Sequence, residues 1–163
     1  MSAKVAIFNK QNKVVLTPEM RRLIRRSCDA VLKSEGFSGT AQIDVSLVDD
    51  AQIKDINSAC RNINFATDVL SFPLGENGEY DINPETGAYM LGDVVISLEH
   101  ALAQGELYGH GTDREIAYLT VHSVLHLLGY DHINSKKEKA VMRLHEEAAL
   151  DTMGLSLKGD DSD

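Results

Sequence analysis

The sequence predicts a single α+β domain, with a small mixed β-sheet of about four strands packed against about five helices. Its 163 residues suit one domain, and no linker or internal repeat divides them. Predicted strands lie in the first part of the chain, whereas the hydrophobic pattern is helical from residue 97 onward. We expect residues 1–157 to form the domain and residues 158–163, KGDDSD, to form a disordered acidic tail.

The N-terminal part predicts a strand, a helix and a second strand. Residues 4–9, KVAIFN, have the composition of a strand, and Thr-Pro-Glu at residues 17–19 supplies an N-cap, a first-turn proline and a first-turn acid. These signals predict a helix at residues 18–34. Residues 42–48, QIDVSLV, alternate between apolar and polar and predict a strand with one buried face. This order favours a right-handed crossover between two parallel strands.

The middle of the chain predicts two more strands. A short helix is expected at about residues 50–59, followed by a strand at residues 68–72, DVLSF. Residues 74–87 are polar and turn-rich, as in a hairpin connection, and lead to a fourth strand at residues 89–98. Three helices are predicted after that, at residues 97–108, 112–128 and about 134–153.

Charge is unevenly distributed along the chain, whose net charge is −9. Residues 1–33 contain 8 Lys and Arg against 2 Asp and Glu, which leaves 8 basic and 23 acidic residues in the remainder. Arg21, Arg22, Arg25 and Arg26 fall largely off the apolar stripe of the predicted first helix. Such a basic face is typical either of a surface that binds a polyanion or of an ordinary solvated helix face.

The chain has no sequence typical of an export signal or a bilayer span, so we expect a cytoplasmic protein that does not bind membranes. Its two cysteines, Cys28 and Cys60, are not arranged as a C-x-x-C pair. In a protein of this size and compartment, we expect both to be buried free thiols.

A cluster of histidines occurs in the sequence HSVLHLLGYDH, residues 122–132. His122 and His126 are four residues apart in a predicted helix, so both imidazoles lie on one face and can bind one ion. Gly129 is suited to end the helix and reverse the chain, which brings His132 back toward the pair. Three neutral imidazoles leave a fourth position open for water, as in catalytic zinc sites.

The residues around this cluster leave alternatives open. Two histidines four apart also occur by chance, and we expect His100, His110 and His145 to be ordinary surface or hydrogen-bonded residues. Asp131 could orient an imidazole or could be a turn carboxylate facing water. The histidine spacing is similar to that of the metzincin proteases, but Ser123 stands where those enzymes have a catalytic glutamate.

Three segments together resemble the bacterial YbeY family of metal-dependent endoribonucleases: INSACRNINFATDVLSFP, LGDVVIS and HSVLHLLGYDH. The resemblance includes Asn57, Arg61, the Thr67 to Pro73 segment, Leu91-Gly92-Asp93 and the histidine cluster. Three positions depart from the family pattern: Cys60 replaces a frequent aromatic residue, Ala66 a proline and Ser123 a glycine. None of them removes an expected metal ligand.

The resemblance implies one Zn²⁺ per chain, held by His122, His126 and His132, with Arg61 as a catalytic residue that reaches the substrate. A guanidinium is suited to this role because it is permanently charged and binds phosphate oxygens in a bidentate manner. From the sequence alone, an exposed arginine paired with an acid is the simpler interpretation. Nickel, copper and iron also accept imidazole ligands, so zinc is a preference.

The leading hypothesis is a zinc-dependent, single-strand-specific endoribonuclease. It would act in maturation of the 3′ end of small-subunit ribosomal RNA and in ribosome quality control. Its expected partners are ribosomal RNA and the ribosome or small subunit, and no DNA is expected. Cleavage could use the RNA 2′-hydroxyl or an activated water. The alternatives are a zinc-dependent peptidase or other metallohydrolase, and a non-catalytic ribosome-assembly factor with a structural metal.

Overall fold

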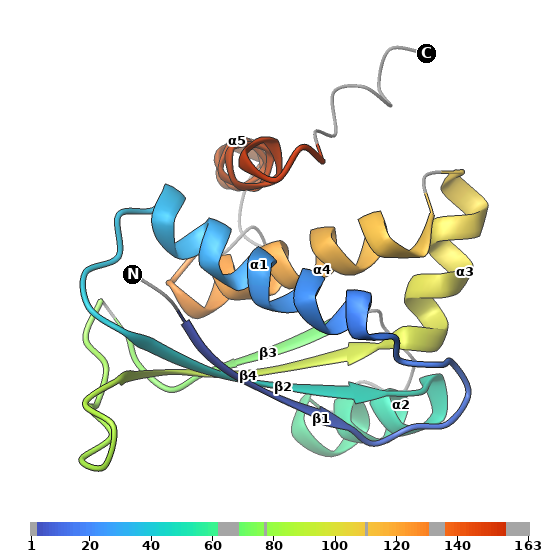
Figure 1. The fold of residues 1–163 in the computed structure, drawn as a ribbon, viewed down its shortest axis with the longest axis horizontal. Helices are drawn as coiled ribbons and strands as arrows, with labels where there is room; N and C mark the ends of the chain where they lie inside the picture. Colours follow the sequence, from blue (N-terminus) through green and yellow to red (C-terminus); the bar gives the residue numbers. More distant parts are fainter. Residues whose placement is uncertain (1–2, 62–68, 77, 110, 131–135, 156–163) are drawn as a thin grey trace.

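A four-stranded mixed sheet forms the centre of the protein (Figure 1). The computed structural model describes residues 3–61, 69–76, 78–109, 111–130 and 136–155, with only the backbone of Cys60 and Arg61. The strands are β1 (Ala3–Asn9), β2 (Ala41–Val48), β3 (Val69–Pro73) and β4 (Tyr89–Ser97), in the order β1-β2-β4-β3. β1, β2 and β4 are parallel, and β3 is antiparallel to β4. The predicted mixed sheet and its parallel first pair are confirmed.

Within the described residues, five helices pack around this sheet: α1 (Pro18–Ser34), α2 (Asp50–Arg61), α3 (Leu98–Tyr108), α4 (Thr112–Leu127) and α5 (Lys136–Thr152). Figure 1 shows α1 and α4 side by side on one face, with α5 beyond them on the side away from the sheet and α2 on the opposite face. The predicted α+β class is confirmed, and boundaries within the described residues differ by only one or two positions. None of the helices described is both long and apolar enough to cross a bilayer.

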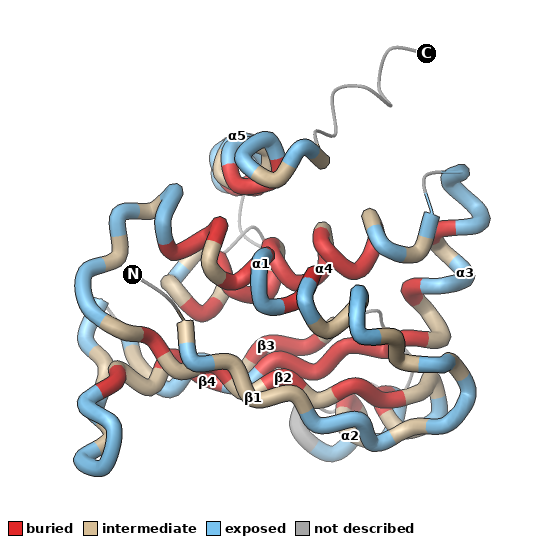
Figure 2. The backbone as a smooth tube through the Cα atoms, viewed as in Figure 1, coloured by how far each residue is buried: buried red, intermediate tan, exposed pale blue. Residues whose placement is uncertain are grey.

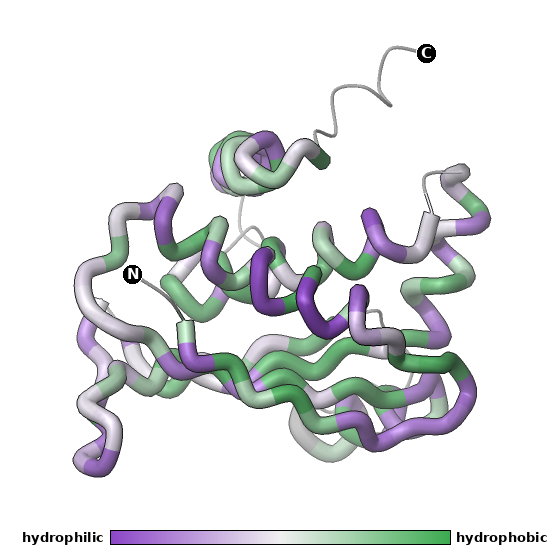
Figure 3. Tube along the Cα trace, in the orientation of Figure 1, coloured by the Kyte–Doolittle hydropathy of each residue, from purple (hydrophilic) through white to green (hydrophobic). Residues whose placement is uncertain are grey.

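α1 begins as its sequence predicts. The Thr17 hydroxyl accepts a hydrogen bond from the Met20 backbone N–H at 3.1 Å, and Pro18 occupies the first turn. Leu23, Ile24, Cys28 and Val31 form part of its buried face, whereas Arg22, Arg25 and Arg26 are exposed and Arg21 is partly exposed. Hydrophilic residues accordingly dominate the visible side of α1 in Figure 3. The basic face is therefore available to solvent.

Two apolar clusters hold the layers together. The larger lies between the sheet and the helices α1, α4 and α5, and includes Ile43, Leu47 and Leu125, all fully buried. The smaller joins Ile53 of α2 to strand residues on the other face, including Leu70. Figure 2 shows burial concentrated in β2, β4 and α4. Each such side chain contributes roughly 1.5–3 kcal/mol of transfer free energy, so α4 is fixed mainly by the hydrophobic effect.

Cys28 belongs to the larger cluster as a buried free thiol, which confirms its predicted state. Complete burial disfavours the thiolate and raises the pKa of Cys28 from 9.0 to about 12, with a smaller contribution from the charge of Asp29. The thiol is therefore a core group and not a reactive one. The prediction for Cys60 concerns a side chain outside the described part of the chain.

Gly92 brings the end of α4 close to the sheet. A Cβ atom at this position would lie 2.4 Å from the carbonyl oxygen of Phe72 and 2.8 Å from a methyl carbon of Leu127. Its φ of +146° is also unfavourable for residues with a side chain. The Leu-Gly-Asp sequence thus permits a close contact between β3, β4 and the C-terminal turn of α4.

Candidate metal centre

α4 is buried on all sides except along one stripe. Apart from its first residues, the positions of this helix with intermediate exposure are Arg114, Tyr118, His122 and His126, spaced four apart. Residues on the remaining faces, such as Ile116 and Leu125, are fully buried. Because residues four apart share one face of a helix, the core contacts of α4 place both histidines on its only accessible side.

The imidazoles of His122 and His126 face one another through their Nε2 atoms, which lie 3.1 Å apart. Their ring planes meet at 76°, with centroids 4.6 Å apart. The other ring nitrogen of His122, Nδ1, forms a short hydrogen bond with the Oε2 atom of Glu146 in α5. This bond places a proton on Nδ1 and leaves the Nε2 lone pair of His122 directed toward His126.

This arrangement fits a divalent metal ion. Two imidazole nitrogens bound at about 2.0–2.1 Å to a tetrahedral zinc ion lie roughly 3.3 Å apart, close to the separation of the two Nε2 atoms. A carboxylate on the far nitrogen of a bound histidine is also a common feature of metal sites. Without metal, a proton shared between the two Nε2 atoms would stabilise the same geometry.

His132, the predicted third ligand, lies outside the described residues, as does Asp131. Among the residues that are described, no group of three histidine, cysteine, aspartate or glutamate side chains gathers around one point. The structure therefore brings together His122 and His126 of the predicted ligand set. The predicted role of His132 remains a prediction.

The turn after α4 begins as the sequence predicts. Gly129 has a φ of +106°, and the backbone N–H of Tyr130 donates to the Leu125 carbonyl at 3.1 Å. The Tyr130 hydroxyl donates to Glu35 Oε1 at 2.5 Å, and His145 Nδ1 lies 2.6 Å from Glu35 Oε2. Burial and the Glu35 carboxylate raise the pKa of Tyr130 to about 12. The start of the turn is thus tied to α1 and α5.

The remaining candidate residues fall into two groups. His145 and His100 have hydrogen-bonding partners, as predicted: Glu35 for His145, and Gln104 at 3.0 Å for His100. Arg61 is the last residue of α2, and its side chain lies outside the described structure, as does the whole of His110. Whether Arg61 reaches the metal centre is therefore still a prediction.

Ser123 is fully buried and its side chain contacts β3. Its hydroxyl forms a short hydrogen bond with that of Ser71, across the interface between α4 and the sheet. The residue after the first histidine is thus directed into the core, away from the partly exposed stripe. A base at this position, as in the metzincins, is replaced here by a structural hydrogen bond.

Glu146 is the residue of the site that the sequence interpretation missed. It is only 3% exposed, and it shares the buried face of α5 with Met142, Ala149 and Leu150. The sequence signal for Glu146 was its spacing from the apolar residues of α5, because it falls at a position where an amphipathic helix usually has an apolar residue. A glutamate that is buried at such a position requires a polar partner. His122 supplies that partner from α4.

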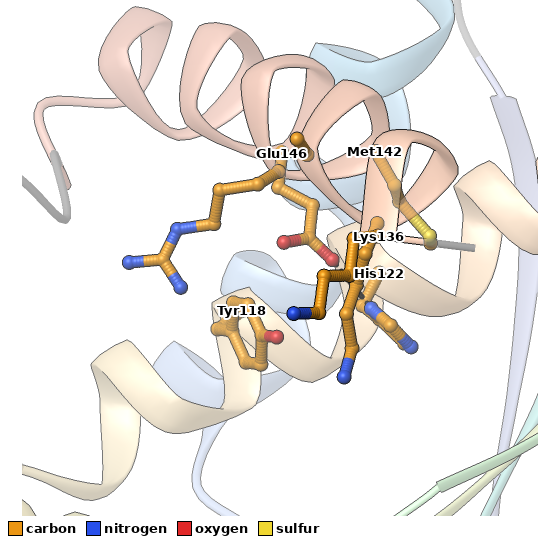
Figure 4. A pocket seen from close by; sticks show the side chains of 8 residues that line it. Tyr118, His122, Lys136, Met142 and Glu146 are labelled. Atoms are coloured by element: carbon orange, nitrogen blue, oxygen red, sulfur yellow. Dashed lines mark hydrogen bonds and ion pairs between the residues drawn. The ribbon is translucent and has the colours of Figure 1, made fainter. Parts of the chain in front are cut away.

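A pocket of about 440 Å³ opens beside these residues, between α4 and α5. Figure 4 shows the side chains of Tyr118 and His122 from α4, and those of Lys136 and Glu146 from α5, around the same space. The ring of Tyr118 lies 5.8 Å from that of His122, centroid to centroid. The face of α4 that carries His122 is therefore accessible from solvent through a cavity with basic and aromatic walls.

Comparison with known proteins identifies the family of this chain and agrees with its fold. The family model described as Endoribonuclease YbeY matches residues 6–154. An Endoribonuclease YbeY of Caldicellulosiruptor bescii is 45% identical over 94% of this chain and 99% of its own length. That of Clostridium tetani is 43% identical over 93% and 98%. The solution structure of TM1509 from Thermotoga maritima shares the fold, with a TM-score of 0.57, 21% identity, and coverage of 98% of this chain and 96% of that one. This chain therefore belongs to the YbeY family of endoribonucleases.

Proposed function

We propose that the chain is a zinc-dependent, single-strand-specific endoribonuclease that matures the 3′ end of small-subunit ribosomal RNA in the cytoplasm. Its partners would be ribosomal RNA and the ribosome or its small subunit, with a further role in ribosome quality control. Family membership supports endonucleolytic cleavage of RNA. The choice of metal, substrate and compartment is our inference.

One observation carries the metal part of this proposal. The Nε2 atoms of His122 and His126 lie 3.1 Å apart, and Glu146 holds the far nitrogen of His122. These two histidines would bind the zinc, with His132 as the third ligand, while Glu146 fixes the tautomer and orientation of His122. Zinc, when bound, supplies Lewis acidity that stabilises charge on a phosphoryl oxygen.

Arg61 would add a second positive group. At the end of α2, it belongs to the segment that precedes β3. A guanidinium there would grip a phosphate oxygen of the RNA through two hydrogen bonds and stabilise the negative charge that grows during phosphoryl transfer. Removing it should therefore slow cleavage without changing how much zinc the protein holds.

The peptidase alternative lacks a specific observation in its favour. Its catalytic glutamate would stand at position 123, where the serine hydroxyl is buried against Ser71. The assembly-factor alternative differs from our proposal in one measurable respect, since removing a purely structural metal would lower the melting temperature while ribosome binding persisted.

Incubation with a 3′-extended small-subunit ribosomal RNA tests the proposal. The wild-type protein should cut in single-stranded RNA, a chelator should abolish cleavage, and zinc should restore it. His126→Ala should lose both zinc and activity, whereas Arg61→Ala should lose activity and retain zinc. His100→Ala, a histidine outside the site, is the matched control and should behave as wild type.

Elemental analysis of the same proteins separates the possible outcomes. About one zinc per chain is expected in the wild type and in Arg61→Ala, and almost none in His126→Ala. Equal cleavage by all variants would indicate a contaminating nuclease. A zinc content unaffected by His126→Ala would contradict the metal site itself.

A further inference from the structure

The pocket beside His122 contains a cluster of positive charge that the metal centre does not use. Lys136, Lys139 and Arg143 of α5 line it, at spacings of three and four residues that place them on one face of the helix. All three residues are exposed to solvent. We call the pocket lined by these residues, Tyr118 and His122 the α5 basic pocket.

Nearby acidic residues neutralise only part of the positive charge of this pocket. Glu146 also lines it, but its carboxylate is buried against the His122 ring. Arg143 lies 3.4 Å from Glu147, one turn away on the same helix, so part of its charge is directed there. Lys136 and Lys139 therefore contribute most to the positive potential.

The surrounding chain makes this local charge unusual. Beyond residue 33, basic residues are outnumbered by 8 to 23, yet three of these eight line one pocket. The same pocket is bounded by His122, one of the two candidate metal ligands. A general solvated face would not be expected to collect cations at the entrance of the site in an otherwise acidic body.

We propose that the α5 basic pocket binds backbone phosphates of the single-stranded RNA next to the position of cleavage, with Lys136 and Lys139 as the main phosphate contacts. This proposal rests on the proposed function and specifies how that site holds its substrate. Lysine binds a phosphate as a mobile point charge and does not read sequence. The pocket would therefore position the strand relative to His122 without selecting a base.

Tyr118 gives the pocket a second property suited to a single strand. Its ring lines the cavity on the α4 side, 5.8 Å from the His122 ring. A base of an unpaired strand can stack on such a ring, and this contact tolerates any sequence. A base within a duplex is not available for it. The aromatic wall thus favours single-stranded RNA, whereas the lysines bind any nucleic-acid backbone.

Binding of a labelled single-stranded uridine oligonucleotide with 2′-O-methyl groups tests the proposal independently of cleavage. Lys136→Ala/Lys139→Ala should weaken binding on the order of tenfold near 0.1 M salt. It should also reduce the slope of log affinity against log salt by about 1.4, because each phosphate contact in a single strand contributes about 0.7. Zinc content should remain that of the wild type.

The matched control is Lys13→Ala/Lys137→Ala. It removes the same charge at two exposed lysines that do not line the pocket, one of them on the same helix. Its affinity and salt dependence should stay close to those of the wild type. Equal weakening in both double variants, or an unchanged salt slope in the pocket variant, would overturn the proposal in favour of a diffuse charge effect.

Two further measurements separate the parts of the proposal. Tyr118→Leu should weaken oligonucleotide binding roughly tenfold, while Tyr118→Phe should retain it, because only the ring is needed for stacking. An equal loss of oligonucleotide binding in both variants would refute the stacking role of Tyr118. Competition by an oligoglutamate peptide as effective as that by RNA would instead identify a site for acidic peptides.

The outcome also distinguishes this proposal from the proposed function. If the wild type cleaves no ribosomal RNA but the pocket variant alone loses oligonucleotide binding, the phosphate site stands and the assigned reaction fails. If the wild type cleaves and the two double variants bind alike, the reaction stands and this pocket is refuted as its substrate site.

Discussion

The two helices that carry the candidate metal centre differ in how they are held. α4 is buried along most of its length and exposes its histidines on a single stripe. α5 buries only Met142, Glu146, Ala149 and Leu150 among its 17 residues and exposes charged residues elsewhere. The difference separates two tasks in the candidate site: α4, largely interior, fixes the positions of His122 and His126, whereas α5, at the surface, supplies Glu146, which contacts His122, and the exposed charged residues of the pocket.

Shortening one leucine on each helix should produce the largest contrast between them. Leu125→Ala on α4 should lower the free energy of unfolding by about 2–5 kcal/mol, because Leu125 is fully buried and its loss leaves a cavity. Leu144→Ala on α5, where the side chain is 66% exposed, should change it by less than about 0.5 kcal/mol. Urea denaturation measures both, and similar values would contradict the comparison.

The contribution of α5 to the site should appear in metal affinity. Glu146→Gln preserves the shape of the side chain but removes the charge that orients His122. We expect zinc affinity to fall by about 10- to 100-fold, equivalent to about 1.4–2.7 kcal/mol. Glu147→Gln, next to it on the same helix, is the control. Competition with a chromogenic chelator measures the affinity, and an unchanged value would remove Glu146 from the site.

The hydrogen bond between Ser123 and Ser71 should have a smaller effect on stability. Ser123→Ala should cost about 1 kcal/mol, because it leaves the buried Ser71 hydroxyl with one partner fewer. If the two hydroxyls interact, Ser71→Ala/Ser123→Ala should cost less than the sum of the single changes. Thermal unfolding of all four proteins completes a double-mutant cycle, and strict additivity would show that the bond contributes nothing.

The smallest effect is expected from the Cys28 thiol. This residue lies in α1, which packs against α4. Because burial raises the pKa of Cys28 to about 12, almost no thiolate forms in the folded protein below pH 9. In a Cys60→Ser background, iodoacetamide at about pH 8.5, close to the ordinary thiol pKa, should label Cys28 only on unfolding. Stability linked to this group is complete below pH 9 and decreases as the pH rises toward 12. Rapid labelling of folded protein would contradict the close packing of α1.

Local signals predicted much of the fold. The N-cap at Thr17, the alternation in β2 and the helical stop at Gly129 depend on neighbouring residues, and each has the predicted conformation. The spacing of His122 and His126 likewise sufficed to place them on one face. Local patterns reach their limit where a partner comes from another element. The contact of Glu146 with His122 and that of Ser123 with Ser71 depend on how α4 packs against α5 and β3. No short stretch of the sequence contains both partners of either contact.

The order of the strands also affects how the protein folds as it is synthesised. β2 is central and pairs with β1, which precedes it, and with β4, which follows β3: Ala3 lies beside Ala41, and Val45 lies beside Val94. Both parallel pairings join residues distant in sequence, and such topologies fold more slowly than locally connected ones. Until β4 has left the ribosome, one edge of β2 stays unpaired and open to association with other chains. The sheet can be completed only after β4 has been synthesised and released from the ribosome. The rate of translation therefore sets when this protein, which we propose to act on ribosomal RNA, can complete its own sheet.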